Sequence, residues 1–215
     1  MKKVILFAIC LLLLIPMPVY ASPNKYALIV SYDGHKESRI WASTCARLLR
    51  DVLVDNGYRQ KDIIFLNNNK ATKENVIEEI NSLSGEVVVA FFGHGGATGI
   101  GLHKSWLSHT ELRNLLSNLD SEKQLIIIDT CGSGGAIIEG YDGVVLNKTN
   151  RIVLTSTVFE NESSVFTGHL TDWSRAVFEW GFENADFNGD GVVSVEEAGS
   201  VKGGMSDGYE GEFFL

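Results

Sequence analysis

Two short segments of the chain each present a reactive side chain directly after an apolar run. Residues 91–96 (Phe-Phe-Gly-His-Gly-Gly) deliver His94, and residues 126–135 (Ile-Ile-Ile-Asp-Thr-Cys-Gly-Ser-Gly-Gly) deliver Cys131. Glycines follow both residues, so backbone N–H groups can approach a bound molecule without obstruction from Cβ atoms. A thiol and an imidazole presented in this way suit nucleophilic attack on a carbonyl carbon. The pattern predicts a Cys–His site in which the Gly95 and Cys131 N–H groups hold the oxyanion.

Each of these two residues also has a purely structural interpretation. Cys131 alone could be a small buried residue, and His94 alone could be a polar residue that ends a strand. Their shared setting, a glycine turn after an apolar run, favours the catalytic interpretation, and we expect a cysteine peptidase acting on proteins or peptides. Residues 94–96 also resemble the oxyanion turn of α/β-hydrolase esterases, but no Gly-x-Ser-x-Gly elbow follows them.

The remaining cysteines and histidines lack this setting. Cys45 lies on the apolar stripe of a predicted helix, so we expect it to fill the core. A bridge between Cys45 and Cys131 would disarm Cys131, and we expect free thiols because a lone half-buried thiol is commoner than such a bridge. We expect surface residues or helix caps at the other histidines, which are His35, His103, His109 and His169.

The elements that must position these residues alternate along the chain. Short apolar runs without alternation are typical of strands buried on both faces, and they span residues 26–31, 63–66, 87–92, 125–129 and 152–154. Helical patterns fall at residues 41–53, 75–83, 110–119 and 172–180, the last with Trp173, Val177 and Trp180 facing inward. This order predicts an α/β fold, a three-layer α/β/α sandwich with a mostly parallel central sheet. Ligands bind beyond the carboxyl ends of such strands, so His94 and Cys131 would open onto one crevice if their strands are neighbours.

Residues 1–21 have the pattern of a secretory signal peptide. Two lysines precede an apolar run at residues 4–15, and Val19-Tyr20-Ala21 stands before Ser22. The run is too short to span a bilayer, so we expect a secreted or periplasmic protein without a membrane anchor after signal removal. Residues 22–215 would form one domain. The formal net charge of −9 argues against nucleic acid or an anionic membrane surface as a partner.

These segments resemble the caspase-like cysteine peptidases, and most of all their legumain-like branch. The resemblance covers nearly all of the chain after residue 21 and includes residues 27–30, 92–96, 129–134 and 160–164. It implies a caspase-type α/β/α sandwich and endopeptidase activity carried by His94 and Cys131. The caspase signature itself has Gln-Ala before the cysteine, whereas this chain has Asp129-Thr130. Glu37 stands where legumain-like enzymes have an asparagine.

The same resemblance implies a specificity pocket. Legumain-like enzymes build it from an arginine after the first strand, an acid two residues before the cysteine, serines after the next strand and an acid that opens the following helix. Those positions hold Arg39, Asp129, Ser163 and Asp172. An arginine and carboxylates can donate to and accept from one neutral amide, which predicts cleavage after Asn, and after Asp at lower pH. Two acids against one arginine leave a basic preference open. Asp172 could instead be a simple N-cap, and Arg39 a solvated loop residue.

Residues 186–197 match the twelve-residue calcium loop Asp-x-Asn-x-Asp-Gly-x5-Glu. The oxygen ligands would come from Asp186, Asn188, Asp190, the Val192 carbonyl, Ser194 and Glu197. The alternative is a polar turn that caps the following helix. A single loop suits a structural Ca²⁺ clamp better than a sensor, and we expect no organic cofactor.

Two other functions fit the same residues. A peptide ligase or transpeptidase would use the same acyl-enzyme and hand the acyl group to an amine instead of to water. A catalytically inactive, calcium-dependent binding module could also be built on this fold, and labelling of Cys131 by an acyl probe distinguishes it from an enzyme.

Overall fold

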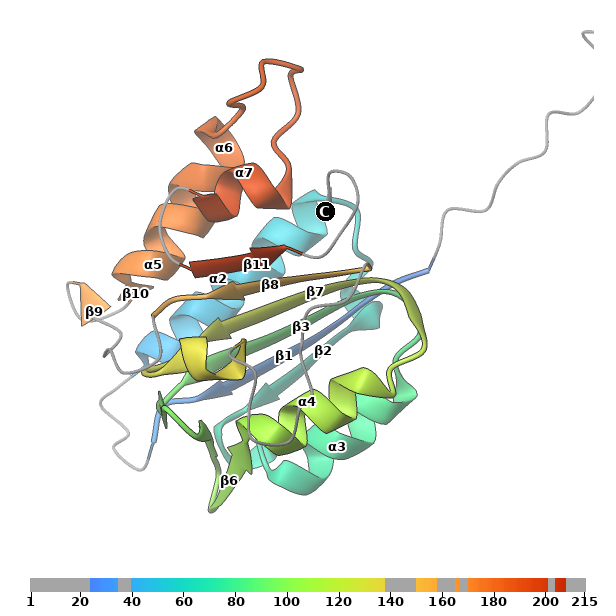
Figure 1. The fold of residues 1–215 in the computed structure, drawn as a ribbon, viewed down its shortest axis with the longest axis vertical. Coiled ribbons are helices and arrows are strands. Elements are labelled where there is room, and N and C mark those ends of the chain that lie inside the picture. The colour runs from blue at the N-terminus through green and yellow to red at the C-terminus, as the bar shows by residue number, and fades with distance from the viewer. Residues whose placement is uncertain are drawn as a thin grey trace, which may run out of the picture.

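The computed structural model describes residues 24–34, 40–137, 150–157, 165–166, 170–200 and 204–207. They form a three-layer α/β/α sandwich around a sheet with the strand order β11-β8-β7-β3-β1-β2 (Figure 1). Parallel pairing joins β1 (Lys25–Tyr32), β2 (Ile63–Asn67), β3 (Gly85–Gly93), β7 (Ser121–Asp129) and β8 (Arg151–Thr155). At one edge, β11 (Gly204–Asp207) runs antiparallel to β8. The predicted fold class is therefore confirmed.

Helices cover both faces of this sheet (Figure 1). One face carries α3 (Lys73–Ser82) and α4 (His109–Ser117). The other carries α2 (Trp41–Asp55), α5 (Asp172–Ser174), the π-helix η4 (Arg175–Gly181), α6 (Phe182–Asn184) and α7 (Val195–Ser200). Short 3₁₀ turns lie at η1 (Gln60–Asp62), η2 (Asn68–Lys70) and η3 (Ser133–Ala136).

The central position of β3 in the sheet explains why polar and apolar residues do not alternate in its sequence. Val88 and Ala90 belong to the core beneath α2, whereas Val89 and Phe91 belong to the core beneath α3 and α4. Both faces of the strand are thus removed from water, as expected for a central parallel strand.

Local sequence signals determine where two of the helices begin. At α4, the Glu111 N–H donates to the Ser108 hydroxyl at 3.2 Å and the Ser108 N–H donates to the Glu111 carboxylate at 3.0 Å. This reciprocal pair is a capping box, which satisfies two backbone groups that the helix leaves unpaired. The Thr72 hydroxyl caps α3 by accepting from the Asn75 N–H. The helices predicted at residues 75–83 and 110–119 therefore begin and end within two residues of their expected bounds.

The helix predicted at residues 172–180 differs in form from the expectation. Its central part is the π-helix η4, whose wider turn rotates each residue less than an α-helix does. Trp173 and Val177 are buried as expected, but Trp180 is 48% exposed, so its predicted inward orientation was wrong. The wider turn changes the helical phase between Val177 and Trp180 and carries the last side chain away from the core.

Two small sheets were not predicted. One pairs β4 (Gly95–Gly96), β5 (Gly99–Leu102) and β6 (Ser105–Ser108), directly after His94. The other pairs β9 (Val165–Phe166) with β10 (Leu170–Thr171). Across the part of the chain that the structure describes, no helix is both long enough and apolar enough to cross a membrane. The proposed signal peptide, residues 1–21, lies outside that part.

Candidate active site

The sheet topology brings the two candidate catalytic loops together. Strands β3 and β7 are hydrogen-bonded neighbours, and Phe92 of β3 stands opposite Asp129 of β7. His94 and Cys131 each follow that pair by two residues, so both lie beyond the carboxyl ends of adjacent strands. The strands that carry the two residues are therefore neighbours, which is the condition on which the sequence predicts a shared site.

Two glycines allow the loops to pack backbone against backbone. A Cβ atom on Gly95 would lie 2.5 Å from Thr130 Oγ1 and 2.9 Å from the Cys131 carbonyl oxygen. Gly132 has a φ of +63°, and a Cβ atom there would lie 2.5 Å from the Ala97 nitrogen. Any side chain at either position would push the loops apart. The peptide after His94 is therefore in direct contact with the peptide that carries Cys131.

The imidazole of His94 is exposed and held by packing. Its ring meets the Trp41 indole edge to face, with centroids 5.8 Å apart and an interplanar angle of 86°. A Cβ atom on Gly34, where φ is +83°, would lie 3.2 Å from His94 Nε2. The Gly101 N–H donates to the His94 carbonyl oxygen at 2.8 Å, which fixes the backbone. Contacts from three different elements therefore determine where this ring lies.

A buried carboxylate holds two of these contacts in place. Asp33 is 3% exposed, and its Oδ1 accepts from the Ala42 N–H at 2.8 Å, while its Oδ2 accepts from the Ser43 hydroxyl. Asp33 thus caps α2, because the first N–H groups of a helix lack partners within the helix. Gly34 follows Asp33 in the chain, and Trp41 precedes Ala42. The two residues that pack against His94 therefore lie next to this cap.

The loop after Cys131 is fixed to the loop that follows β8. The Ser133 N–H donates to Thr157 Oγ1 at 3.0 Å, and the Thr157 N–H donates to Ser133 Oγ at 3.1 Å. Thr157 Oγ1 also lies 3.3 Å from the Thr130 carbonyl oxygen, to which it can donate. Cys131 itself is half-buried. Its loop is therefore held in place while its thiol keeps access to solvent.

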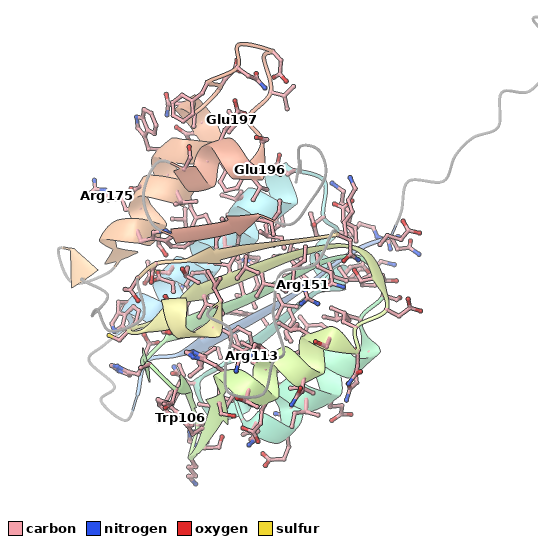
Figure 2. All side chains as sticks on the ribbon, in the orientation of Figure 1. Trp106, Arg113, Arg151, Arg175, Glu196 and Glu197 are labelled. Atoms are coloured by element: carbon pink, nitrogen blue, oxygen red, sulfur yellow. The ribbon has the colours of Figure 1, made fainter. Side chains whose placement is uncertain are left out.

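His109 and Arg113 of α4 are both buried and pack against the same loop. His109 is 3% exposed, so the expected surface position or cap was wrong, and Ser108 is the cap instead. A Cβ atom on Gly135 would lie 2.9 Å from His109 Nδ1, and Arg113 Nη1 donates to the Gly135 carbonyl oxygen at 3.4 Å. Figure 2 shows Arg113 between α4 and the yellow η3 turn. His109 Nδ1 lies 3.2 Å from the Ala97 carbonyl oxygen.

The electrostatics of His109 keep it neutral. Burial lowers the pKa of His109 to about 4, and the nearby Arg113 charge acts in the same direction, against the hydrogen bond to Ala97. Because the Ala97 oxygen can only accept, the proton of the neutral ring lies on Nδ1. An imidazole with this pKa remains uncharged at neutral pH and serves as a packing group under the cysteine loop.

Two of the four residues proposed for the specificity pocket lie in the part of the chain that the structure describes. Asp129 is fully buried, and Ser174 Oγ donates to its Oδ2 at 2.5 Å. Asp172 is the first residue of α5, the position expected for it. Arg39 and Ser163 lie outside the described residues. The four positions are therefore not assembled into a pocket by the described geometry.

The two cysteines have contrasting environments. Cys45 is fully buried on the inner face of α2, within the core cluster that includes Ala46 and Leu49. No disulfide joins Cys45 to Cys131.

The candidate calcium loop has a hydrogen-bonded turn. Asp186 Oδ1 accepts from the Gly189 N–H at 2.9 Å, and its Oδ2 accepts from the Gly191 N–H at 3.0 Å. The Glu197 carboxylate accepts from the Phe187 N–H at 2.9 Å and from the Ser194 N–H at 3.0 Å. Hydrogen bonds from the Ser194 backbone, and then from that of Asn188, lower the pKa of Glu197. Over the described ranges, no three side chains of the His, Cys, Asp or Glu types gather at metal-binding distance.

Sequence reasoning missed several residues of this site, namely Asp33, Gly34, Trp41, His109 and Arg113. One signal was available for the first two. Asp33-Gly34 directly follows the strand at residues 25–32, so the rule that singled out His94 and Cys131 applies to it as well. Trp41, His109 and Arg113 reach the site through helix packing, which leaves no local mark on the sequence.

Comparison with known proteins agrees with this geometry. A family model described as Caspase domain matches residues 24–195, which cover every parallel strand of the sheet and both candidate catalytic loops. No curated protein matches the chain. The chain belongs to the caspase-domain family and is a peptidase of the cysteine type.

Proposed function

We propose that this peptidase uses Cys131 as its nucleophile and His94 as its general acid and base. The Cys131 sulfur attacks the carbonyl carbon of a peptide bond while His94 holds the thiol proton. The C–N bond then breaks, and His94 gives that proton to the leaving amine. Water, with His94 as base, hydrolyses the thioester and releases the new carboxyl group. The Gly95 and Cys131 N–H groups stabilise the oxyanion in both steps.

One observation supports this proposal most directly. A Cβ atom on Gly95 would lie 2.5 Å from the Thr130 hydroxyl oxygen and 2.9 Å from the Cys131 carbonyl oxygen, so only glycine allows this approach. The two N–H groups assigned to the oxyanion therefore belong to backbones in contact, and the histidine precedes one of them. The T-shaped contact with Trp41 also limits the positions that the His94 ring can adopt.

An acyl-type probe directed at thiols tests the proposed roles. We expect the wild-type protein and Cys45→Ala to be labelled stoichiometrically, because Cys45 is buried in the core. Cys131→Ala should not be labelled, and His94→Ala should be labelled at least about a hundredfold more slowly. Equal labelling of all four proteins would eliminate the proposed dyad and favour a binding module.

We infer that the peptidase cleaves after Asn, and after Asp at lower pH. The resemblance of Arg39, Asp129, Ser163 and Asp172 to a legumain-like pocket motivates this specificity. The buried Asp129 carboxylate, which accepts a hydrogen bond from Ser174, is a fixed acceptor two residues before Cys131. Profiling with a peptide library should give cleavage after Asn at pH 7 and additional cleavage after Asp at pH 5. Cleavage only after Lys or Arg would contradict the inference.

We also infer that residues 1–21 direct export and are removed before Ser22. The basic start, the short apolar run and the small residues at the break support this. Mass spectrometry of the protein recovered outside the cytoplasm of an expressing cell should give a chain that begins at Ser22. A chain that keeps residues 1–21 and stays in the cytoplasm would contradict it.

The third inference is a structural Ca²⁺ ion at residues 186–197. The donors fit a hard cation, since oxygen atoms stand at each of the six ligand positions, from Asp186 to Glu197. The turn fits as well, because Gly191 at the sixth position has a φ of +89°, which a side chain would strain. The hydrogen bonds that lower the pKa of Glu197 keep its carboxylate charged.

Melting experiments with and without calcium test this site. The loop precedes α7, whose Gly199 packs against the Leu154 side chain of β8, so a bound ion would stabilise the contact between α7 and the sheet. We expect millimolar Ca²⁺ to raise the melting temperature by several degrees in the wild-type protein and not in Glu197→Gln. Mg²⁺ serves as the control ion. Identical melting curves for both proteins with and without Ca²⁺ would contradict the inference.

A further inference from the structure

The hairpin that follows His94 has one face almost without side chains. Ile100 and Leu102 of β5 are buried in the core beneath α3 and α4. Side chains alternate along a strand, so Gly99 and Gly101 belong to the opposite face. Gly96 of β4 stands opposite Gly99 and extends this bare face toward the catalytic loops. Strands β4 and β5 thus offer a floor of backbone beside His94.

A single large side chain lies on this floor. Trp106 of β6 is 44% exposed, and a Cβ atom on Gly99 would lie 2.6 Å from its Nε1. A Cβ atom on Gly96 would lie 3.9 Å from its Cη2, so the indole extends across the hairpin to β4. Figure 2 shows Trp106 on this hairpin, toward the end of the sheet away from Arg151. One side of the indole contacts glycine backbone and the other remains open to solvent.

Trp106 and His94 lie on the same face of the hairpin. Trp106 stands directly opposite Gly101 in the β5–β6 ladder, and directly opposite residues of an antiparallel pair point to the same face. A Cβ atom on Gly101 would lie 3.6 Å from the His94 Cβ atom. The face that carries the indole is therefore the face against which the catalytic histidine packs.

The Cys131 loop adjoins the near end of this floor. A Cβ atom on Gly132 would lie 2.5 Å from the Gly96 carbonyl carbon, and the far end of the indole reaches toward the same Gly96. One short stretch of backbone therefore separates the Cys131 loop from the aromatic ring. A peptide that extends from the catalytic loops past Gly96 would therefore meet the exposed indole.

We propose that Trp106 binds the substrate segment on the leaving side of the scissile bond. The proposal rests on the proposed function, in which His94 protonates the leaving amine. That amine must lie beside His94, so the residues that follow it pass over the face His94 shares with Trp106. An exposed indole offers a large, rigid, apolar surface to a side chain of that segment. The structure thus favours substrates with an aromatic or aliphatic residue shortly after the cleaved bond.

Two substrates with the same acyl part separate this role from general activity. One is an internally quenched peptide that continues for four residues past the cleaved bond and includes a leucine or phenylalanine. The other replaces that segment with an aminocoumarin amide. Trp106→Ala should lower kcat/KM roughly tenfold for the extended peptide and less than twofold for the coumarin amide. Trp106→Phe should recover most of the loss.

Trp180 provides the matched control, since it is a similarly exposed tryptophan on η4, across the sheet from the hairpin. Trp180→Ala should change neither rate. Equal losses on both substrates in Trp106→Ala, or no loss on either, would overturn the assignment of Trp106 and leave the dyad intact. A wild-type protein that cleaves neither substrate would instead overturn the proposed function.

Discussion

The two ends of the central sheet both contain buried polar groups, but they use them differently. At the amino ends of the strands, the Arg151 side chain is fully buried. Its Nε donates to Gln124 Oε1 at 2.7 Å, and its Nη2 donates to the Leu116 carbonyl oxygen near the end of α4 at 2.5 Å. Gln124 Nε2 donates in turn to the Leu119 carbonyl oxygen. These groups satisfy one another and close the end of a helix.

At the carboxyl ends, buried polar groups support residues that stay accessible. Asp33 caps α2, and Ser133 and Thr157 bind each other, whereas His94 is exposed and Cys131 is half-buried. The polar networks hold the loops, and the two candidate catalytic side chains remain accessible above them. Polar burial at one end thus stabilises the fold, and at the other it also fixes the loops that carry His94 and Cys131.

The largest expected effect distinguishes the two ends by stability. Arg151→Met should lower the free energy of unfolding by about 3 kcal/mol, because the Leu116 and Gln124 oxygens would lose buried donors. Arg50→Met removes a partly exposed arginine that pairs with the exposed Asp51, and it should cost less than about 0.5 kcal/mol. Urea unfolding at pH 7 measures both. The kcat/KM of folded Arg151→Met should stay within twofold of wild type, and a large loss of activity there would erase the contrast between the ends.

The next effect concerns the pH dependence of stability at the carboxyl end. His109 has a pKa of about 4 in the folded protein, below its ordinary value of about 6.5, because burial disfavours the charged ring. Between these values the unfolded chain binds the proton more readily, so stability falls as the pH drops from about 6.5 to 4 and changes no further below that. The expected contribution is about 2 kcal/mol between pH 7 and pH 5.

Melting curves of wild type and His109→Gln at pH 7 and pH 5 measure this contribution. The variant should lose less stability on acidification than wild type, whatever its stability at pH 7. His103→Gln, in the hairpin turn between β5 and β6, serves as the control and should follow wild type. Parallel pH profiles for all three proteins would show that His109 does not titrate as its burial predicts.

Of the substitutions at buried residues, Asp33→Asn should have the smallest effect on stability, together with a measurable effect on catalysis. Asp33→Asn keeps a capping oxygen, so it should lower the free energy of unfolding by only about 1 kcal/mol. The substitution weakens the Asp33 cap of α2, which lies next to Gly34 and Trp41, the two residues that position the His94 ring. Because a displaced ring would transfer protons less efficiently, kcat should fall several-fold with little change in KM. Asp51→Asn, on the exposed side of the same helix, should change neither quantity. A rise in KM at constant kcat would show that Asp33 acts on substrate binding and not on His94.

The sequence was sufficient for the five parallel strands of the sheet, though not for the edge strand β11, and for the position of the candidate dyad. Strands β3 and β7 have strong apolar patterns and include the predicted runs at residues 87–92 and 125–129, so the loops after them followed directly. The glycine-rich hairpin was missed because its glycines hide the alternation that reveals a half-buried strand. The cap of α2 was missed because Asp33 stands nine residues before Ala42, whereas a local cap adjoins its helix. Such features come from tertiary packing, which a linear pattern does not encode.

The contact of Gly95 and Gly132 with the facing loops also limits how this catalyst can change. At each glycine, atoms of the facing loop occupy the space that a side chain would need. Randomising either codon should therefore return glycine alone among active clones. New cleavage preferences must therefore arise around the crevice, at places such as Trp106, while the spacing between sulfur and imidazole is inherited unchanged.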